Sequence, residues 1–179
     1  VLLPIHILWI NLVTDTFPAL ALGFEPAEKD VMSRPPRSAG SSFLSGGVGI
    51  ATVYQGTVEG LLVLLTYWLG ERFYGGDVAI TMAFVAVGAC CMFHCLNLRS
   101  ATLSLFTTGL LSNHKLLLAI LVSSVLHLMV ILVPPLRELF QLTMLTPAQW
   151  GISFGLPLCI IPIVELEKLI GRIRSRRKG

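Results

Sequence analysis

Five long apolar segments dominate this sequence and restrict the chain to folds that lie in a membrane. They cover residues 3–24, 48–70, 78–98, 116–136 and 150–170. Each approaches the ~20 residues that a helix needs to cross a bilayer. Only 13% of the 179 residues are charged, whereas soluble domains carry about 25%. The segments lack the alternating pattern of membrane barrel strands. We therefore predict an all-α bundle of five transmembrane helices that forms one domain over residues 1–179.

The composition excludes several classes of protein. Hydrophobic residues make up 54% of the chain, which is too many for a soluble enzyme or a disordered tail. The four cysteines all lie in apolar stretches, where free thiols behave as small hydrophobic side chains, so a secreted disulfide scaffold is also excluded. The chain opens on Val1 inside an apolar run, without an initiator Met or a signal sequence. We expect it to be the C-terminal piece of a longer protein.

The basic residues predict the orientation of the helices. Eleven of the thirteen Lys and Arg residues lie in the first connection, the third connection and the C-terminal tail, which five spans place on the same side. Only Arg72 and Arg137 lie on the other side. The positive-inside rule therefore places the C-terminus in the cytoplasm and the N-terminus outside.

The tail from Arg172 to Lys178 contains five basic residues. They either bind anionic lipid at the inner leaflet or only fix the orientation of the last span. Nucleic acid is not an expected partner of a tail that is joined to a membrane span.

Polar residues inside the first span are the main functional evidence, because such residues are unfavourable in lipid. Asn11, Thr14 and Asp15 are spaced so that an α-helix groups them on one face. All three carry oxygen, the atom that Ca²⁺ prefers as a ligand. Pro18 adds to this, because it removes the hydrogen bond to the carbonyl of Thr14. The pattern favours an ion site over the alternative, a polar cluster that only joins helices through hydrogen bonds.

Other polar residues within the spans are better explained as structural. Glu59 lies between Gly56 and Gly60, a GxxxG pair that permits a close helix contact. We expect the carboxyl group of Glu59 to face protein and to be protonated or hydrogen-bonded. His94 and His127 could carry protons, but hydrogen bonds between helices are the favoured explanation.

Three cysteines in the third span, Cys90, Cys91 and Cys95, could suggest a site for a soft metal. Soft thiolates would conflict with the oxygen chemistry of the first span, and neighbouring helical residues point about 100° apart. We expect these cysteines to be inert, buried thiols.

Residues 11–37 closely resemble the sixth transmembrane helix and the following loop of P-type calcium-transporting ATPases. The residues that carry the resemblance are Asn11-Leu12-Val13-Thr14-Asp15, Pro18-Ala19, Ala21-Leu22-Gly23-Phe24-Glu25-Pro26 and Met32-x-Arg34-Pro35-Pro36-Arg37. A looser resemblance covers the whole chain, with Thr81-Met82-Ala83, His94, Asn97 and Arg99-Ser100 similar to the eighth helix of bacterial members, and residues 157–165 and Lys168 to the last helix. Sodium–potassium pumps typically have Asp in place of Asn11, and bacterial magnesium pumps differ at Thr14, so the pattern is that of a calcium pump.

The resemblance implies that the five spans are helices six to ten of a ten-helix pump that exports Ca²⁺ through a phosphorylated intermediate, in a bacterial cell membrane. Asn11, Thr14 and Asp15 would be metal ligands. ATP and Mg²⁺ would act only in the full-length protein, in cytoplasmic domains that carry a DKTGT motif. That motif does not occur in the 179 residues. We expect no catalytic or cofactor-binding residue in this chain, and we expect the chain alone to be inactive because three residues cannot complete a Ca²⁺ shell.

One residue departs from the pattern of two-site calcium pumps, which use a glutamate of the eighth helix as a ligand. Alignment through Thr81-Met82-Ala83 and Asn97 puts Cys91 at that position. A neutral thiol is a poor Ca²⁺ ligand. We therefore predict one Ca²⁺ per ATP, bound by Asn11 and Asp15, with Thr14 more peripheral.

Two alternatives to a pump remain open at this stage. One is an ion-coupled secondary transporter, and the other is a non-catalytic membrane protein with a structural polar cluster. A DKTGT motif in the upstream sequence would decide in favour of the pump.

Overall fold

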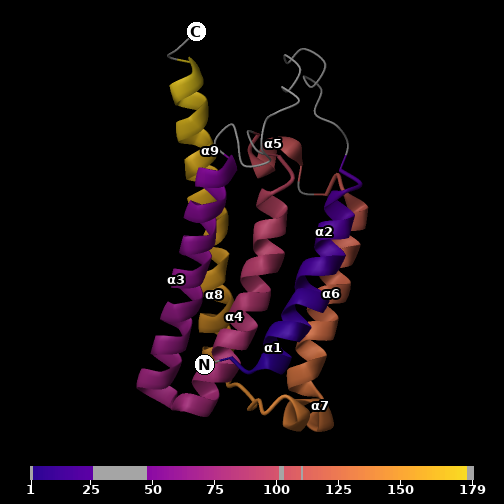
Figure 1. Ribbon diagram of the computed structural model, residues 1–179, viewed down its shortest axis with the longest axis vertical. Helices are drawn as coiled ribbons and strands as arrows, with labels where there is room; N and C mark the ends of the chain where they lie inside the picture. The colour runs from indigo at the N-terminus through magenta and orange to yellow at the C-terminus, as the bar shows by residue number, and fades with distance from the viewer. Residues whose placement is uncertain (1, 26–47, 101–102, 110, 177–179) are drawn as a thin grey trace.

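The computed structural model describes residues 2–25, 48–100, 103–109 and 111–176. These residues form helices joined by turns, with no strand among them, so the predicted all-α bundle is confirmed. Figure 1 shows the helices side by side along the long axis of the molecule. They are α1 (Pro4–Trp9), the π-helix η1 (Ile10–Asp15), α2 (Thr16–Leu22), α3 (Val48–Tyr74), α4 (Gly76–Asn97), α5 (Leu105–Thr108), α6 (His114–Leu132), α7 (Pro134–Leu139), α8 (Pro147–Leu158) and α9 (Ile160–Arg176).

Four helical stretches are long and apolar enough to cross a membrane: Pro4–Leu22, which comprises α1, η1 and α2, and the helices α3, α4 and α6. The fifth predicted span, residues 150–170, is interrupted at Cys159, where α8 ends and α9 begins. Pro157 and Pro162 lack the N–H that would bond the carbonyl four residues earlier, and their rings clash with it. Among the described residues, four of the five predicted spans are therefore continuous candidate spans and the fifth is a broken helix, so the predicted count of five is approximate.

The helix α4 lies at the centre of the bundle, and most of its residues between Ala79 and Cys90 are buried. Glycines let neighbouring helices approach closely. A Cβ atom on Gly70 would lie 2.7 Å from the Cα of Ala79, and one on Gly88 would lie 2.5 Å from Nε2 of His127. Such close packing stabilises the bundle because lipid gives helices no hydrophobic reason to associate.

The pair Gly56 and Gly60 makes no such contact. No atom lies within 4 Å of a Cβ built on either residue, and both are exposed. The expected close contact at this GxxxG pair is therefore wrong for the helices that the structure describes. The tight turn at Gly75, with φ of +95°, sets how α3 folds back on α4 and brings Gly70 rather than the GxxxG pair into contact.

His6 stabilises the end of the bundle where the first span begins. The backbone N–H of Leu3 donates to Nδ1 of His6 at 3.1 Å, so Nε2 carries the proton and donates to the carbonyl of Phe140 at 2.6 Å. The imidazole is fully buried and packs against the rings of Phe84 and Phe140. It joins the start of the first span to the end of α7, a role that the sequence does not predict.

The Glu25–Arg99 cluster, which also includes Asn113, fixes the end of the first span that is opposite to His6. The Arg99 guanidinium donates to both carboxylate oxygens of Glu25, at 2.9 Å from Nη2 and 3.2 Å from Nε. Asn113 donates to the same carboxylate at 2.6 Å. The hydrogen bonds from Arg99 hold the pKa of Glu25 below its usual value, although partial burial opposes this. The cluster ties the end of α2 to the connection between α4 and α6.

Candidate functional site

The polar segment of the first span forms the π-helix η1, Ile10–Asp15. In a π-helix each hydrogen bond reaches a residue five positions away, so the turn widens by one residue. Pro18 explains why the helix widens here, since it gives no hydrogen bond to the carbonyl of Thr14 and its ring pushes that carbonyl aside. Single-turn π-helices occur frequently at functional sites.

Hydroxyl groups satisfy carbonyls in this irregular segment. Oγ1 of Thr14 donates to the carbonyl of Ile10 at 2.8 Å. Oγ of Ser123, on α6, donates to the carbonyl of Val13 at 2.7 Å. A backbone group without a partner is unfavourable by several kcal/mol at membrane depth, so these two bonds stabilise the π-helix and fix it against α6.

The structure places the three predicted ligands differently. Thr14 is fully buried, whereas Asn11 and Asp15 are exposed on the open side of the helix. The predicted grouping on one face depends on α-helical spacing, and the π-helical turn changes that spacing. Asn11 and Asp15 therefore share an exposed surface, and Thr14 lies behind them with its hydroxyl bonded to the backbone.

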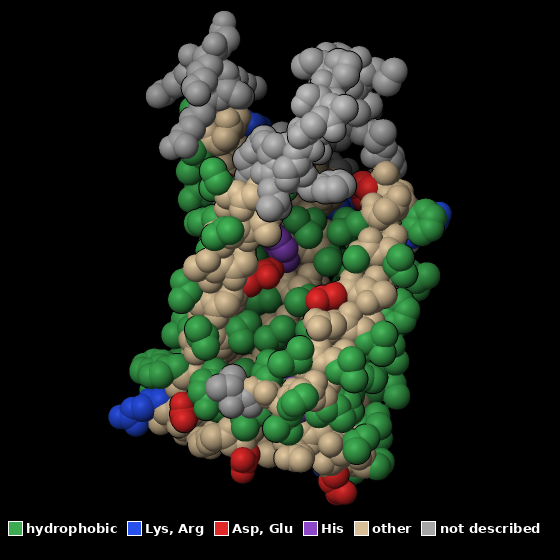
Figure 2. Space-filling view, in the orientation of Figure 1, with side chains coloured by type: hydrophobic (Ala, Val, Ile, Leu, Met, Phe, Trp, Pro, Cys, Tyr) green, Lys and Arg blue, Asp and Glu red, His purple; other side chains and the backbone are tan. Residues whose placement is uncertain are grey.

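Side chains of α3 and α4 act electrostatically on Asp15, which is itself exposed. The Cys91 thiol of α4 is one of the groups that act on Asp15. Glu59 of α3 and Cys95 of α4 interact with it electrostatically. Figure 2 shows acidic side chains and a histidine on the walls of a hollow between α3 and the first span. The hollow therefore concentrates negative charge beside the exposed face of the π-helix.

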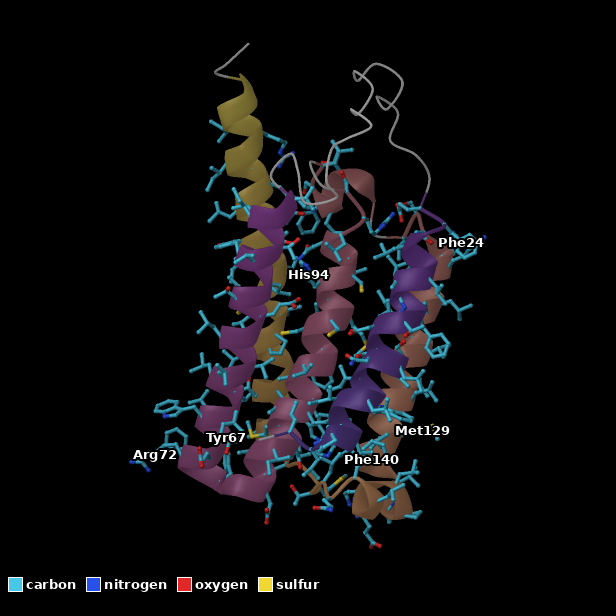
Figure 3. All side chains as sticks on the ribbon, viewed as in Figure 1. Phe24, Tyr67, Arg72, His94, Met129 and Phe140 are labelled. Atoms are coloured by element: carbon cyan, nitrogen blue, oxygen red, sulfur yellow. The ribbon has the colours of Figure 1, made fainter. Side chains whose placement is uncertain are left out.

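Glu59 is half-buried, but not through the GxxxG contact from which burial against protein is expected. In the described part of the chain, its buried Oε1 atom has no hydrogen-bond partner. Its Oε1 atom lies 3.8 Å from Nδ1 of His94, and Figure 3 places His94 between α3 and α4. The sequence predicts no contact between these two residues. No local pattern could pair them, because they lie on different helices and only the packing of α3 on α4 brings them together.

The cysteines and histidines of the spans form no metal cluster in the part of the chain that the structure describes. There, no three side chains of His, Cys, Asp or Glu lie close enough together to hold a metal ion. Cys90, Cys91 and Cys95 are free thiols. His127 makes the expected bond between helices, with Nε2 at 3.2 Å from the carbonyl of Phe84. A Ca²⁺ ion takes about six to eight oxygens, so the described residues can supply only part of its shell.

Two parts of the predicted pattern lie outside the described residues. They are the Met32–Arg37 motif and the last residues of the basic tail, and no side chain of the tail beyond Ile173 is described.

Comparison with known proteins gives a consistent result. Residues 1–170 match the family model described as "Cation transporting ATPase, C-terminus". The chain is 41% identical to "Calcium-transporting ATPase 1" of Bacillus cereus over 92% of its length, and 35% identical to "Calcium-transporting ATPase" of Bacillus subtilis over 99%. It is 33% identical to the human "Calcium-transporting ATPase type 2C member 1" over 96%. The matched regions cover 20%, 19% and 19% of these relatives, so the chain spans about a fifth of their length.

Proposed function

We propose that this chain, which belongs to the family of cation-transporting ATPases and matches their C-terminal membrane part, forms part of the ion site of an ATP-driven calcium pump. The full-length protein would export Ca²⁺ through a phosphorylated intermediate. ATP and Mg²⁺ would act in regions of the pump that these residues do not include. Support for calcium comes from relatives that are named calcium-transporting ATPases.

The observation that carries the proposal is the exposed pair Asn11 and Asp15 on a π-helix beside an acidic hollow. Asp15 supplies charge that offsets the charge of a dication, and the Asn11 amide supplies a neutral oxygen. Thr14 is peripheral, since its hydroxyl bonds the backbone. Other helices of the pump and water would supply the remaining oxygens.

Two other functions fit these observations less well. A purely structural cluster would use Asn11 and Asp15 to join helices, but in the described bundle Ser123 makes a bond to this segment through the Val13 carbonyl. An ion-coupled secondary transporter has no support from the named relatives, which are ATPases.

We also propose that one Ca²⁺ is transported per ATP. By the resemblance, Cys91 aligns with the glutamate ligand of two-site pumps, and in this structure Cys91 is a free thiol rather than a second carboxylate. A neutral thiol does not replace a carboxylate as a ligand for a hard cation.

The proposed orientation has the C-terminus in the cytoplasm of a bacterial cell, with the basic tail against anionic lipid. Arg72 and α7, which carries Arg137, lie at one end of the bundle, and α5 lies at the other (Figures 1 and 3). The two basic residues that are predicted to lie outside are therefore at the same end, as the proposed orientation requires.

The test of the ion site is Asp15→Asn in the full-length pump. Loss of the carboxylate should abolish Ca²⁺-dependent phosphorylation from ATP while the protein still folds. Asp77→Asn is the matched control, because Asp77 is an exposed acid in the first turn of α4. Normal Ca²⁺-stimulated turnover in Asp15→Asn would remove Asp15 from the site.

A further inference from the structure

Ser123 of α6 makes a hydrogen bond between two helices at the back of the π-helix. Its Oγ donates to the carbonyl of Val13 at 2.7 Å, and its side chain is fully buried. Val13 is buried too, whereas Asn11 and Asp15 on the other side of the segment are exposed. Figure 1 shows α6 alongside the first span. The hydroxyl of Ser123 therefore lies behind the two predicted ligands and acts on the backbone that carries them.

The Val13 carbonyl is well placed to control the direction of the ligand side chains. It belongs to the planar peptide group that joins Val13 to Thr14, so a bond that holds this group sets the path of the chain into Asp15. The irregular backbone ends at Asp15, which has a φ of −98°, and Thr16 returns to −64°, close to the α-helical value of about −63°. The bond from Ser123 is therefore made inside the segment whose spacing sets the positions of the ligands.

The neighbouring hydroxyl of Ser124 shows that a serine at this depth does not need another helix. Serine in a helix can donate to the carbonyl four residues earlier on its own helix. Ser124 does so, since its Oγ donates to the Ile120 carbonyl at 2.7 Å, and it also lies 3.0 Å from Sδ of Met92. Each hydroxyl has one hydrogen to donate. The hydrogen of Ser123 is used on the π-helix rather than on α6.

Packing on both sides of Ser123 gives its hydroxyl a fixed position. Before it on α6, Leu116 is buried in one cluster with Ala21 of α2. After it, the His127 ring stacks on the ring of Phe84 in α4, and Nε2 lies 3.2 Å from the Phe84 carbonyl. Protein interiors packed in this way do not deform continuously, so α6 is a firm support for the segment that it contacts.

We propose that Ser123 is a positioning residue, which sets Ca²⁺ affinity by holding the backbone that carries Asn11 and Asp15 in its ion-binding arrangement. This inference rests on the proposed function, because it concerns the same site. Without the hydroxyl, the segment populates other arrangements, and only the fraction of molecules in the competent arrangement binds the ion. The apparent affinity falls in proportion to that fraction, while the ligands themselves stay the same.

The experiment measures phosphorylation of the purified full-length pump from ATP as a function of Ca²⁺ concentration, together with the thermal unfolding midpoint. Ser123→Ala should raise the half-saturating Ca²⁺ concentration roughly three- to tenfold, the range expected for one hydrogen bond between membrane helices, at an unchanged maximal level. Ser123→Thr, which keeps a hydroxyl, should restore the wild-type value. Ser124→Ala is the matched control and should leave half-saturation unchanged, because the Ser124 hydroxyl bonds its own helix.

The outcomes separate this inference from the proposed function. If Ser123→Ala lowers the unfolding midpoint but leaves half-saturation at the wild-type value, the role of Ser123 is structural and the inference is overturned. Equal shifts in Ser123→Ala and Ser124→Ala also overturn it, because general packing of α6 then controls the affinity. Wild-type phosphorylation that does not depend on Ca²⁺ overturns the proposed function, and this inference with it. If Ser123→Ala does not fold, Ser123→Cys, whose thiol is a weaker donor, should show a smaller shift in the same direction, and wild-type half-saturation there would refute the proposal.

Discussion

The contact between Gly88 of α4 and His127 of α6 makes a sharp test of the packing. An alanine Cβ at position 88 would lie 2.5, 2.8 and 2.9 Å from three atoms of the imidazole ring. The ring would have to move, which puts at risk its 3.2 Å hydrogen bond to the Phe84 carbonyl. Overpacking lowers the free energy of unfolding by about 1–3 kcal/mol, and loss of the hydrogen bond lowers it by about 1 kcal/mol. The higher helix propensity of alanine relative to glycine raises it by about 1 kcal/mol. Gly88→Ala should therefore destabilise the bundle by about 1–3 kcal/mol.

The assay is the thermal unfolding midpoint of the purified full-length pump. Gly88→Ala should lower it, whereas Gly155→Ala, where nothing lies within 4 Å of the added Cβ, should leave it unchanged or raise it. His127→Ala removes the ring, so adding Gly88→Ala to that variant should cause little further loss. A midpoint for Gly88→Ala equal to that of the wild type, or fully additive losses in the double variant, would refute the reasoning.

Three further predictions concern orientation, acid stability and stoichiometry. A cysteine at Glu71, in a variant without Cys159, should react with an impermeant thiol reagent added outside, and one at Ser41 should not; the reverse pattern would invert the topology. Because the pKa of Glu25 is lower in the folded state, its contribution to stability is complete above the ordinary value of 4.5 and is lost as the pH falls through the lower folded-state value. Glu25→Gln should remove that part of the acid dependence of the unfolding midpoint, and identical acid curves would contradict the assignment. Bound ⁴⁵Ca²⁺ per phosphorylation site should be near one, and a value near two would exclude the one-ion proposal.

Much of the candidate site follows from the residues of the first span. Asn11 and Asp15 are recognisable because polar side chains are unfavourable in lipid. Pro18 is recognisable because it has no backbone N–H to donate within the helix. The position of the irregular turn is therefore predictable. The separation of Thr14 from Asn11 and Asp15 is not, because it depends on the conversion of this turn to a π-helix, which packing against Ser123 stabilises.

Length and hydropathy alone determine that the chain forms apolar helices, since any segment that lies in lipid must satisfy its own backbone hydrogen bonds. They do not determine which side of a helix meets protein. In water, an apolar stripe along a helix marks its buried face. In a membrane, apolar side chains face lipid and protein alike, so the hydropathy pattern does not show which face is buried against protein. Only the tertiary structure shows that Gly70 and Gly88, rather than Gly56 and Gly60, are the points of close contact. For the same reason only the packing of α3 on α4 decides that Glu59 meets His94.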